Sequence, residues 1–291
     1  MTKWWGRGMR PPNDLDAPAR AAIRRVLEKP MFELIPLPNA LEQAKHLPAG
    51  ATVSVSASPA RGMDATLDLA EDLRRMDFDV VLHLSARLTA DRAHLARTLE
   101  RLDRLHITRV FVIGGDGEES TEFDDALSLL TAMDEISHNL TDIGIACYPE
   151  GHAVIPASAL GQALLDKQPL ASSMTTQMCF LGKTIVDWLA DQRKAGVTLP
   201  VSLGMPGVAD RLRLLRISAR IGVGDSIRFL SKNTGVVARF VRPGSYNPGE
   251  LLEELGSELD DPTYGIAGVH IFTFNSCDST ENWRRRYLEE L

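Results

Sequence analysis

Several polar side chains stand inside short apolar runs of this sequence or directly after them. Glu33 is the clearest case, because it lies between Phe32 and Leu34. A carboxylate that is buried without a partner costs free energy, so Glu33 needs either a buried partner or a part in chemistry. The other candidates at such positions are His83, Asp116, Tyr148, Glu150, His152, Gln177 and Asn275.

Taken singly, these residues also have ordinary structural explanations. The segment 114–116, Gly-Gly-Asp, can be a tight turn in which Asp116 caps the local backbone. His83 can be a hydrogen-bonded core residue, and Gln177 can belong to a satisfied polar layer. A metal-dependent barrel lyase that uses His83 and Asp116 is a further alternative. No set of His, Asp and Glu recurs at ligand spacing along the chain, however, so we expect no metal site.

The elements that must position these residues follow from an alternation of apolar runs with amphipathic segments. Runs that are apolar nearly throughout predict strands buried on both faces, and the segments between them predict helices. Eight strands that alternate with helices indicate a closed (β/α)8 barrel. An open doubly wound sheet has the same alternation and is the alternative, although it usually has fewer strands. The runs are 31–36, 52–57, 79–84, 109–113, 142–147, 172–180, 199–203 and 265–274.

The chain divides into an N-terminal arm and one catalytic domain. Residues 1–30 precede the alternation, and a helix is predicted over 16–29 with Ala22, Ile23, Val26 and Leu27 as its apolar stripe. Residues 31–291 form the predicted barrel. In such barrels functional groups lie at the C-terminal ends of the strands and in the loops that follow, so we expect the candidate side chains to meet there.

Composition excludes several classes of function. The net charge of −7 argues against a nucleic-acid binder, which usually has a basic surplus. The three cysteines, Cys147, Cys179 and Cys277, are sparse and odd in number, which is typical of a reducing compartment. No apolar run approaches the ~20 residues of a membrane helix, and the N-terminus lacks the apolar segment of a signal peptide. We therefore expect a cytoplasmic protein with small-molecule partners and no membrane partner, and a homo-oligomer remains open.

Six segments together resemble the methylenetetrahydrofolate reductase family, and they follow the family order from residue 31 to residue 275. Phe-Glu-Leu-Ile-Pro at 32–36 resembles the family's Phe-Glu-Phe-Phe-Pro, and His-Leu-Ser at 83–85 resembles its His-Leu-Thr. Val-Ile-Gly-Gly-Asp at 112–116 is similar to Leu-Arg-Gly-Asp, and Ala-Cys-Tyr-Pro-Glu-Gly-His at 146–152 is similar to Ala-Tyr-Pro-Glu-x-His. Thr-Gln-Met-Cys-Phe at 176–180 and His-Ile-Phe-Thr-Phe-Asn at 270–275 resemble Thr-Gln-Phe-Phe-Phe and His-Phe-Tyr-Thr-Leu-Asn.

The resemblance implies an oxidoreductase of one-carbon and methionine metabolism that interconverts 5,10-methylenetetrahydrofolate and 5-methyltetrahydrofolate by hydride transfer. Glu33 then matches the general acid, because a buried carboxylic acid can supply the proton that opens the methylene bridge. Gln177 matches the residue that hydrogen-bonds the pterin, and Asp116 matches the aspartate that stabilises the cationic intermediate. Asn275 is a further implied substrate contact. The implied cofactor contacts are Ser56, His83, Gly115, Asp116, Tyr148, His152 and Lys167.

The sequence departs from the family at cationic positions. An Arg before the Gly-Asp pair is Gly114 here, an Arg after the last Asn is Ser276, and an Arg-Lys pair is reduced to Lys167. A diphosphate usually needs cationic or helix-terminal partners. FAD is the expected cofactor, and direct hydride transfer from NAD(P)H to the folate without flavin, as in related short reductases, is the alternative.

A second class of function keeps the same barrel without a redox step. A tetrahydrofolate-binding or methyl-carrier protein would need the pterin contacts Asp116 and Gln177 but would have no use for an acid at Glu33. The presence of Glu33 therefore favours the enzyme.

Overall fold

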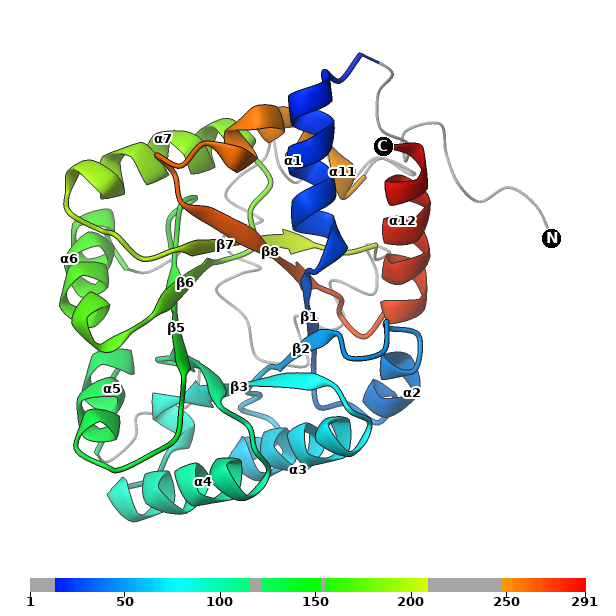
Figure 1. Ribbon diagram of the computed structural model, residues 1–291. Helices are drawn as coiled ribbons and strands as arrows, with labels where there is room; N and C mark the ends of the chain where they lie inside the picture. The colour runs from blue at the N-terminus through cyan, green and yellow to red at the C-terminus, as the bar shows by residue number, and fades with distance from the viewer. Residues whose placement is uncertain (1–13, 116–121, 153–154, 209–246) are drawn as a thin grey trace.

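The strands of this computed structural model, which describes residues 14–115, 122–152, 155–208 and 247–291, form a closed parallel barrel. Each strand pairs with the next one along the chain, and β8 pairs back with β1 (Figure 1). The predicted (β/α)8 barrel is confirmed, and the open-sheet alternative is wrong. The strands are β1 (Met31–Leu34), β2 (Thr52–Val55), β3 (Asp79–Ser85), β4 (Arg109–Ile113), β5 (Asp142–Cys147), β6 (Ser173–Thr176), β7 (Val201–Pro206) and β8 (Ile266–Phe272).

Helices surround the strands as an outer ring (Figure 1). None of the helices in the described ranges is both long enough and apolar enough to cross a bilayer. The α-helices are α1 (Ala17–Glu28), α2 (Ala40–Ala44), α3 (Gly62–Arg75), α4 (Arg92–Arg104), α5 (Ala126–Asp134), α6 (Ala157–Lys167), α7 (Gly182–Lys194), α11 (Gly249–Leu255) and α12 (Cys277–Glu290). Short 3-10 turns are η1 (Ala86–Leu88), η2 (Gln168–Leu170) and η3 (Gly256–Asp260).

Helix α1 confirms the helix predicted before the first strand. Its N-cap, Asp16, accepts a hydrogen bond from the Ala19 amide at 2.8 Å, which satisfies one of the amides that a helix start leaves open. The predicted apolar stripe is buried and belongs to the same hydrophobic cluster as the outer side of the strands. The described part of the N-terminal arm is thus packed against the barrel.

The two faces of the strands differ in polarity. Alternate residues such as Phe32, Val53 and Leu82 belong to the hydrophobic cluster beneath the helices. Because successive side chains point to opposite faces, the residues between them, such as Glu33 and Ser54, point into the barrel. The interior is therefore more polar than the expected runs of apolar residues suggested, and more polar than usual for this fold.

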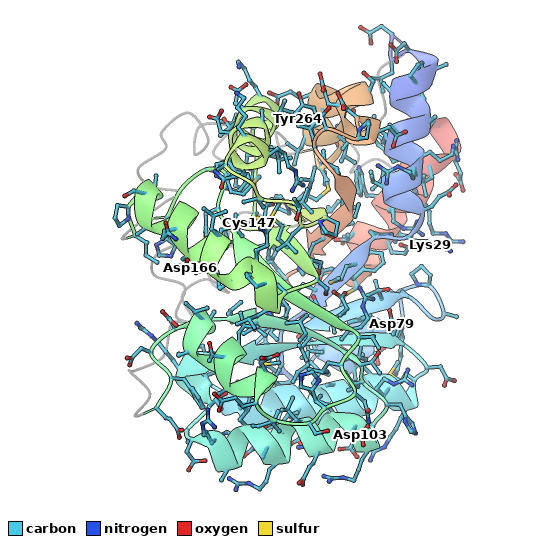
Figure 2. The ribbon with its side chains drawn as sticks, turned by 60° about the vertical axis from the view of Figure 1, so that its left-hand side comes forward. Lys29, Asp79, Asp103, Cys147, Asp166 and Tyr264 are labelled. Carbon is cyan, nitrogen blue, oxygen red and sulfur yellow. The ribbon has the colours of Figure 1, made fainter. Side chains whose placement is uncertain are left out.

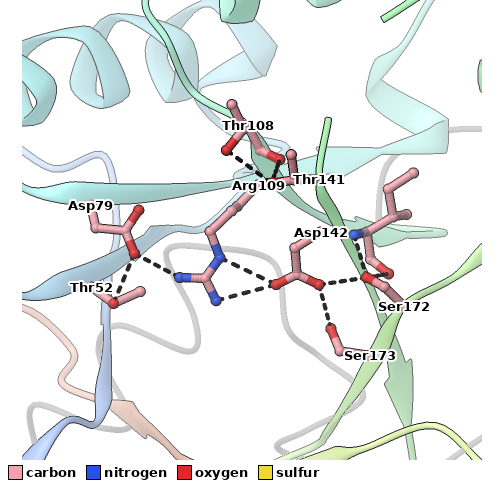
Figure 3. Close-up of polar contacts among 9 residues, drawn as sticks. Thr52, Asp79, Thr108, Arg109, Thr141, Asp142, Ser172 and Ser173 are labelled. Atoms are coloured by element: carbon pink, nitrogen blue, oxygen red, sulfur yellow. Dashed lines mark hydrogen bonds and ion pairs between the residues drawn. The ribbon is translucent and has the colours of Figure 1, made fainter. Parts of the chain in front are cut away.

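An ionic network fills the end of the barrel at which the strands begin (Figure 3). Arg109 donates to Asp79 at 2.7 Å and to Asp142 at 3.2 Å. Thr52 donates to Asp79, and Ser173 donates to Asp142. In Figure 2, Asp79 lies on the same side of the molecule as Lys29, which precedes β1, and Asp103, in the last turn of α4. This side is the amino end of the barrel, opposite the end where chemistry is expected.

Candidate functional site

Three buried titratable side chains meet inside the barrel. Glu33 of β1, His83 of β3 and His270 of β8 are 9%, 5% and 1% exposed. Nε2 of His270 lies 3.3 Å from Oε2 of Glu33, which is within hydrogen-bond distance. Nε2 of His83 lies 3.7 Å from the same oxygen. Glu33 thus has the buried partners that its place in an apolar run required.

Aromatic rings surround this cluster. The ring of His83 lies 4.9 Å from that of Phe111, and the ring of His270 lies 4.8 Å from that of Phe272. The pKa of His83 is lowered to about 4, chiefly by burial, with Glu33 opposing the shift and nearby His270 adding to it. His83 is therefore neutral near pH 7, and the cluster does not hold Glu33 between two imidazolium ions.

The same cluster has ligand atoms within 4.8 Å of one another, so its spacing suits a metal ion. Spacing along the chain did not indicate this set, because Glu33, His83 and His270 come from strands that are far apart in the sequence. A ligating imidazole normally donates its second N–H to a fixed partner. In the described residues, however, Nδ1 of His270 is buried without a hydrogen-bond partner. This arrangement fits a hydrogen-bonded acid better than a metal centre.

Two residues of the β8 end hold Glu33 and the segment after it. Thr273 donates from Oγ1 to the main-chain oxygen of Glu33 at 2.5 Å. The amide of Asn275 accepts from the Ile35 N–H and donates to the Ile35 carbonyl, both at 2.9 Å. Asn275 was expected to contact substrate, and here its buried amide joins the end of β8 to the segment that follows β1.

The ends of β2 and β4 carry further predicted cofactor contacts. Ser56 follows β2, and its N–H and Oγ both donate to the Leu34 carbonyl. Gly115 follows β4 with φ of +87°, and a Cβ there would lie 2.1 Å from Oγ of Ser85. Only glycine fits this position without a shift. Asp116, the predicted stabiliser of the cationic intermediate, lies outside the described residues.

The loop after β5 presents Tyr148 and His152, whose rings meet edge to face with centroids 5.2 Å apart. Between them, Glu150 accepts hydrogen bonds from the amides of Phe180 and Leu181. Burial raises the pKa of the Glu150 carboxyl, the two backbone hydrogen bonds oppose that shift, and nearby Glu254 adds to it.

Gln177 is the first residue after β6, because that strand ends at Thr176. The sixth predicted run, 172–180, placed Gln177 inside the strand, and this boundary is wrong. Its side chain is exposed, and its Oε1 accepts from the amide of Met178 at 2.8 Å. The exposed amide at the strand end can turn toward a ligand.

The resemblance expects cationic side chains around a diphosphate at positions 114, 167 and 276. Among the described residues, these positions do not form such a cationic cluster. Lys167 occupies the last turn of α6, the end of that helix that leads down to the start of β6. The Gly114 carbonyl accepts from the Arg87 amide, and Ser276 is the buried N-cap of α12. Burial lowers the pKa of Lys167, whereas nearby Cys147, the last residue of β5, and Asp125 oppose that shift.

Sequence reasoning missed His270 and Thr273 as neighbours of Glu33. His270 is a single polar residue inside the last apolar run, and Thr273 is the first residue after β8, so neither shows which way it points until the inward face and the end of the strand are known.

Comparisons with known proteins agree on one family. The family model described as methylenetetrahydrofolate reductase matches residues 36–222. A relative from Caenorhabditis elegans, described as a probable methylenetetrahydrofolate reductase (NADPH), is 27% identical, with 82% of this chain and 38% of the relative covered. The chain thus spans well under half of that relative's length.

Solved structures align more loosely. A phosphonopyruvate hydrolase aligns over 92% of this chain and 84% of its own, with a TM-score of 0.48 and 8% identity. A chitinase from Rhizomucor miehei aligns over 89% of this chain and 100% of its own, with a TM-score of 0.45 and 10% identity. Likeness of this extent carries no argument about function.

Proposed function

Because this chain belongs to the methylenetetrahydrofolate reductase family, we propose that it reduces 5,10-methylenetetrahydrofolate to 5-methyltetrahydrofolate with hydride from a nicotinamide nucleotide. The observation that carries the proposal is the buried Glu33, with its carboxyl oxygen 3.3 Å from His270. A folate carrier without a redox step has no need for a carboxylic acid held in this way.

The chemistry requires one proton and one hydride. Glu33 donates a proton to the departing folate nitrogen, the bond from that nitrogen to the bridging carbon breaks, and an iminium forms on the other nitrogen. Hydride from the reduced nicotinamide adds to the bridging carbon and gives the methyl group, while the nicotinamide is oxidised. Gln177 hydrogen-bonds the pterin, and Asp116 balances the positive charge of the iminium.

The contacts to the nicotinamide nucleotide are proposed for Ser56, His83, Gly115, Tyr148 and His152. An additional flavin fits these residues poorly, because Gly114 and Ser276 offer no cation and burial lowers the pKa of the expected cation that remains, Lys167. We therefore favour direct hydride transfer over a flavin relay. An absorption spectrum of freshly purified protein tests this choice, since bound oxidised flavin absorbs strongly in the visible range, and titration with FAD completes the test.

The test of the proposed function is the variant Glu33→Gln, assayed at saturating folate and NAD(P)H. The amide keeps the shape of the side chain but cannot donate the required proton, so turnover should fall by roughly 10²–10⁴. Affinity for 5-methyltetrahydrofolate should change little. Turnover within about threefold of wild type, a change far below that range, would make Glu33 structural and would favour the carrier.

A matched control removes another buried carboxylate away from the strand ends. Glu281 of α12 is 6% exposed and pairs with Arg284. Glu281→Gln should lower stability and leave turnover unchanged, which separates the loss of a buried charge from the loss of the acid.

A further inference from the structure

The carboxylate of Glu150 joins the two loops that carry proposed ligand contacts. Glu150 lies between Tyr148 and His152 in the loop after β5. Its Oε1 accepts from the amide of Phe180 at 2.6 Å and from the amide of Leu181 at 3.0 Å. Both donors belong to the loop after β6, which begins at Gln177.

The backbone of that second loop is held at both of its halves. The amide of Gln177 donates to the Cys147 carbonyl of β5 at 2.8 Å, and the amide of Cys179 donates to the Gly204 carbonyl of β7 at 2.9 Å. Carbonyl groups of the neighbouring strands thus fix the first half of the loop, which contains Gln177 and Cys179. Glu150 accepts the amides of the second half, Phe180 and Leu181. Because the Gln177 side chain is exposed, its direction depends on this backbone rather than on packing.

The same carboxylate serves helix α7, which starts directly after the loop. The N-cap of α7, Leu181, makes no side-chain cap, although a helix start leaves amides that need acceptors. Glu150 takes the Leu181 amide, and Glu254 of α11 takes the Lys183 amide at 3.2 Å. Negative charge at this end of a helix is favourable. Two carboxylates therefore cap one helix, but only Glu150 also bonds the loop that holds Gln177.

We propose that Glu150 is a positioning residue for folate recognition, which acts by fixing the loop that presents Gln177. This inference rests on the proposed function, in which Gln177 contacts the pterin. Without the carboxylate, the Phe180 and Leu181 amides lose their acceptor and the loop relaxes. Folate affinity then falls, while the proton transfer from Glu33 continues once folate is bound.

The experiment is a double-mutant cycle on the full chain, read out by calorimetric titration with 5-methyltetrahydrofolate and by steady-state kinetics. Glu150→Ala should raise the Kd and the KM for folate about tenfold, as expected for a lost charge-assisted hydrogen bond, with kcat within about twofold. Glu150→Gln keeps an acceptor oxygen and should recover most of the affinity. In a Gln177→Ala background, Glu150→Ala should add little, because the group that it positions is already gone.

Glu254→Ala is the matched control, since it removes the other cap of α7 without touching the loop. It should lower stability as Glu150→Ala does and leave the folate Kd unchanged. An affinity loss in this control equal to that of Glu150→Ala would overturn the proposal, as would independent effects of Glu150→Ala and Gln177→Ala that simply multiply. If Gln177→Ala weakens folate and Glu150→Ala does not, only this inference fails. If Gln177→Ala leaves folate affinity unchanged, the proposed substrate site fails as well.

Discussion

The neutral state of His83 predicts a specific loss of stability in acid. Its pKa lies at about 4 in the folded chain against 6.5 for an ordinary histidine, chiefly because burial penalises the imidazolium. Between these values the unfolded chain binds more protons than the folded one, so the free energy of unfolding falls as the pH falls. From pH 7.5 to pH 5 the loss from this residue is about 2 kcal/mol. Below the folded pKa both states are protonated and the loss levels off.

The groups that face His83 do not reverse this sign. Glu33 from β1 raises the pKa and His270 from β8 lowers it. Burial is the largest of these effects and outweighs the attraction of Glu33, so the pKa of His83 stays below its ordinary value.

The assay is equilibrium urea unfolding at the two pH values for wild type and His83→Gln. The variant lacks the titrating ring, so its loss between pH 7.5 and pH 5 should be smaller by about 2 kcal/mol. His46→Gln, at an exposed position before β2, controls for removal of any histidine and should behave as wild type. Equal losses in wild type and His83→Gln would refute the reasoning, because the folded chain would then accept a proton on His83 as readily as the unfolded chain does.

Two further predictions concern the two ends of the barrel. Gly115→Ala should lower stability by about 2–4 kcal/mol and reduce turnover, because it combines a positive φ with a Cβ 2.1 Å from a serine oxygen. Gly50→Ala, with φ of +68° and open space around its Cβ, should cost only about 1–2 kcal/mol in the same melting experiment; equal costs would remove the steric argument. Arg109→Ala should destabilise the chain by roughly 1–3 kcal/mol, since two carboxylates at the amino end lose their shared cation and the side chains are partly exposed. The kcat of Arg109→Ala should match that of wild type. A large loss of kcat would mean that this ionic network at the amino end affects the chemistry at the carboxyl end of the barrel.

The fold was predictable because the alternation of apolar runs with amphipathic segments repeats along the chain. Each strand lies within its predicted apolar run or within three residues of it. The ends of the strands were less predictable, as the sixth run shows. Residues 177–180 are mostly apolar, but the amides of Met178 and Phe180 bond to the side chains of Gln177 and Glu150 rather than to a neighbouring strand, so the segment forms a loop instead. Tertiary hydrogen bonds decided this boundary, and a single sequence does not contain them.

The candidate site was predictable residue by residue but not as a cluster. Glu33 stood out because a carboxylate in an apolar run is costly. His270 lies 237 positions later in the chain, and its contact with Glu33 depends on the closure of β8 against β1 and on which face each side chain takes. The contacts of Asn275 were hidden for the same reason, since its amide partners are backbone atoms of Ile35 in the segment that follows β1.

The polar interior explains how the barrel can place an acid near its strand ends. Apolar strand residues face the helices and form the main hydrophobic cluster, so the free energy of burial comes mainly from outside the barrel. Inside, Arg109 and its two carboxylates fill the amino end, while Glu33 and the two histidines occupy the interior beyond them. The interior therefore positions polar side chains, whereas the free energy of hydrophobic burial comes mainly from the outer face of the strands. The carboxyl group of Glu33 is tolerated there because Nε2 of His270 lies within hydrogen-bond distance of it and His83 is a second polar neighbour.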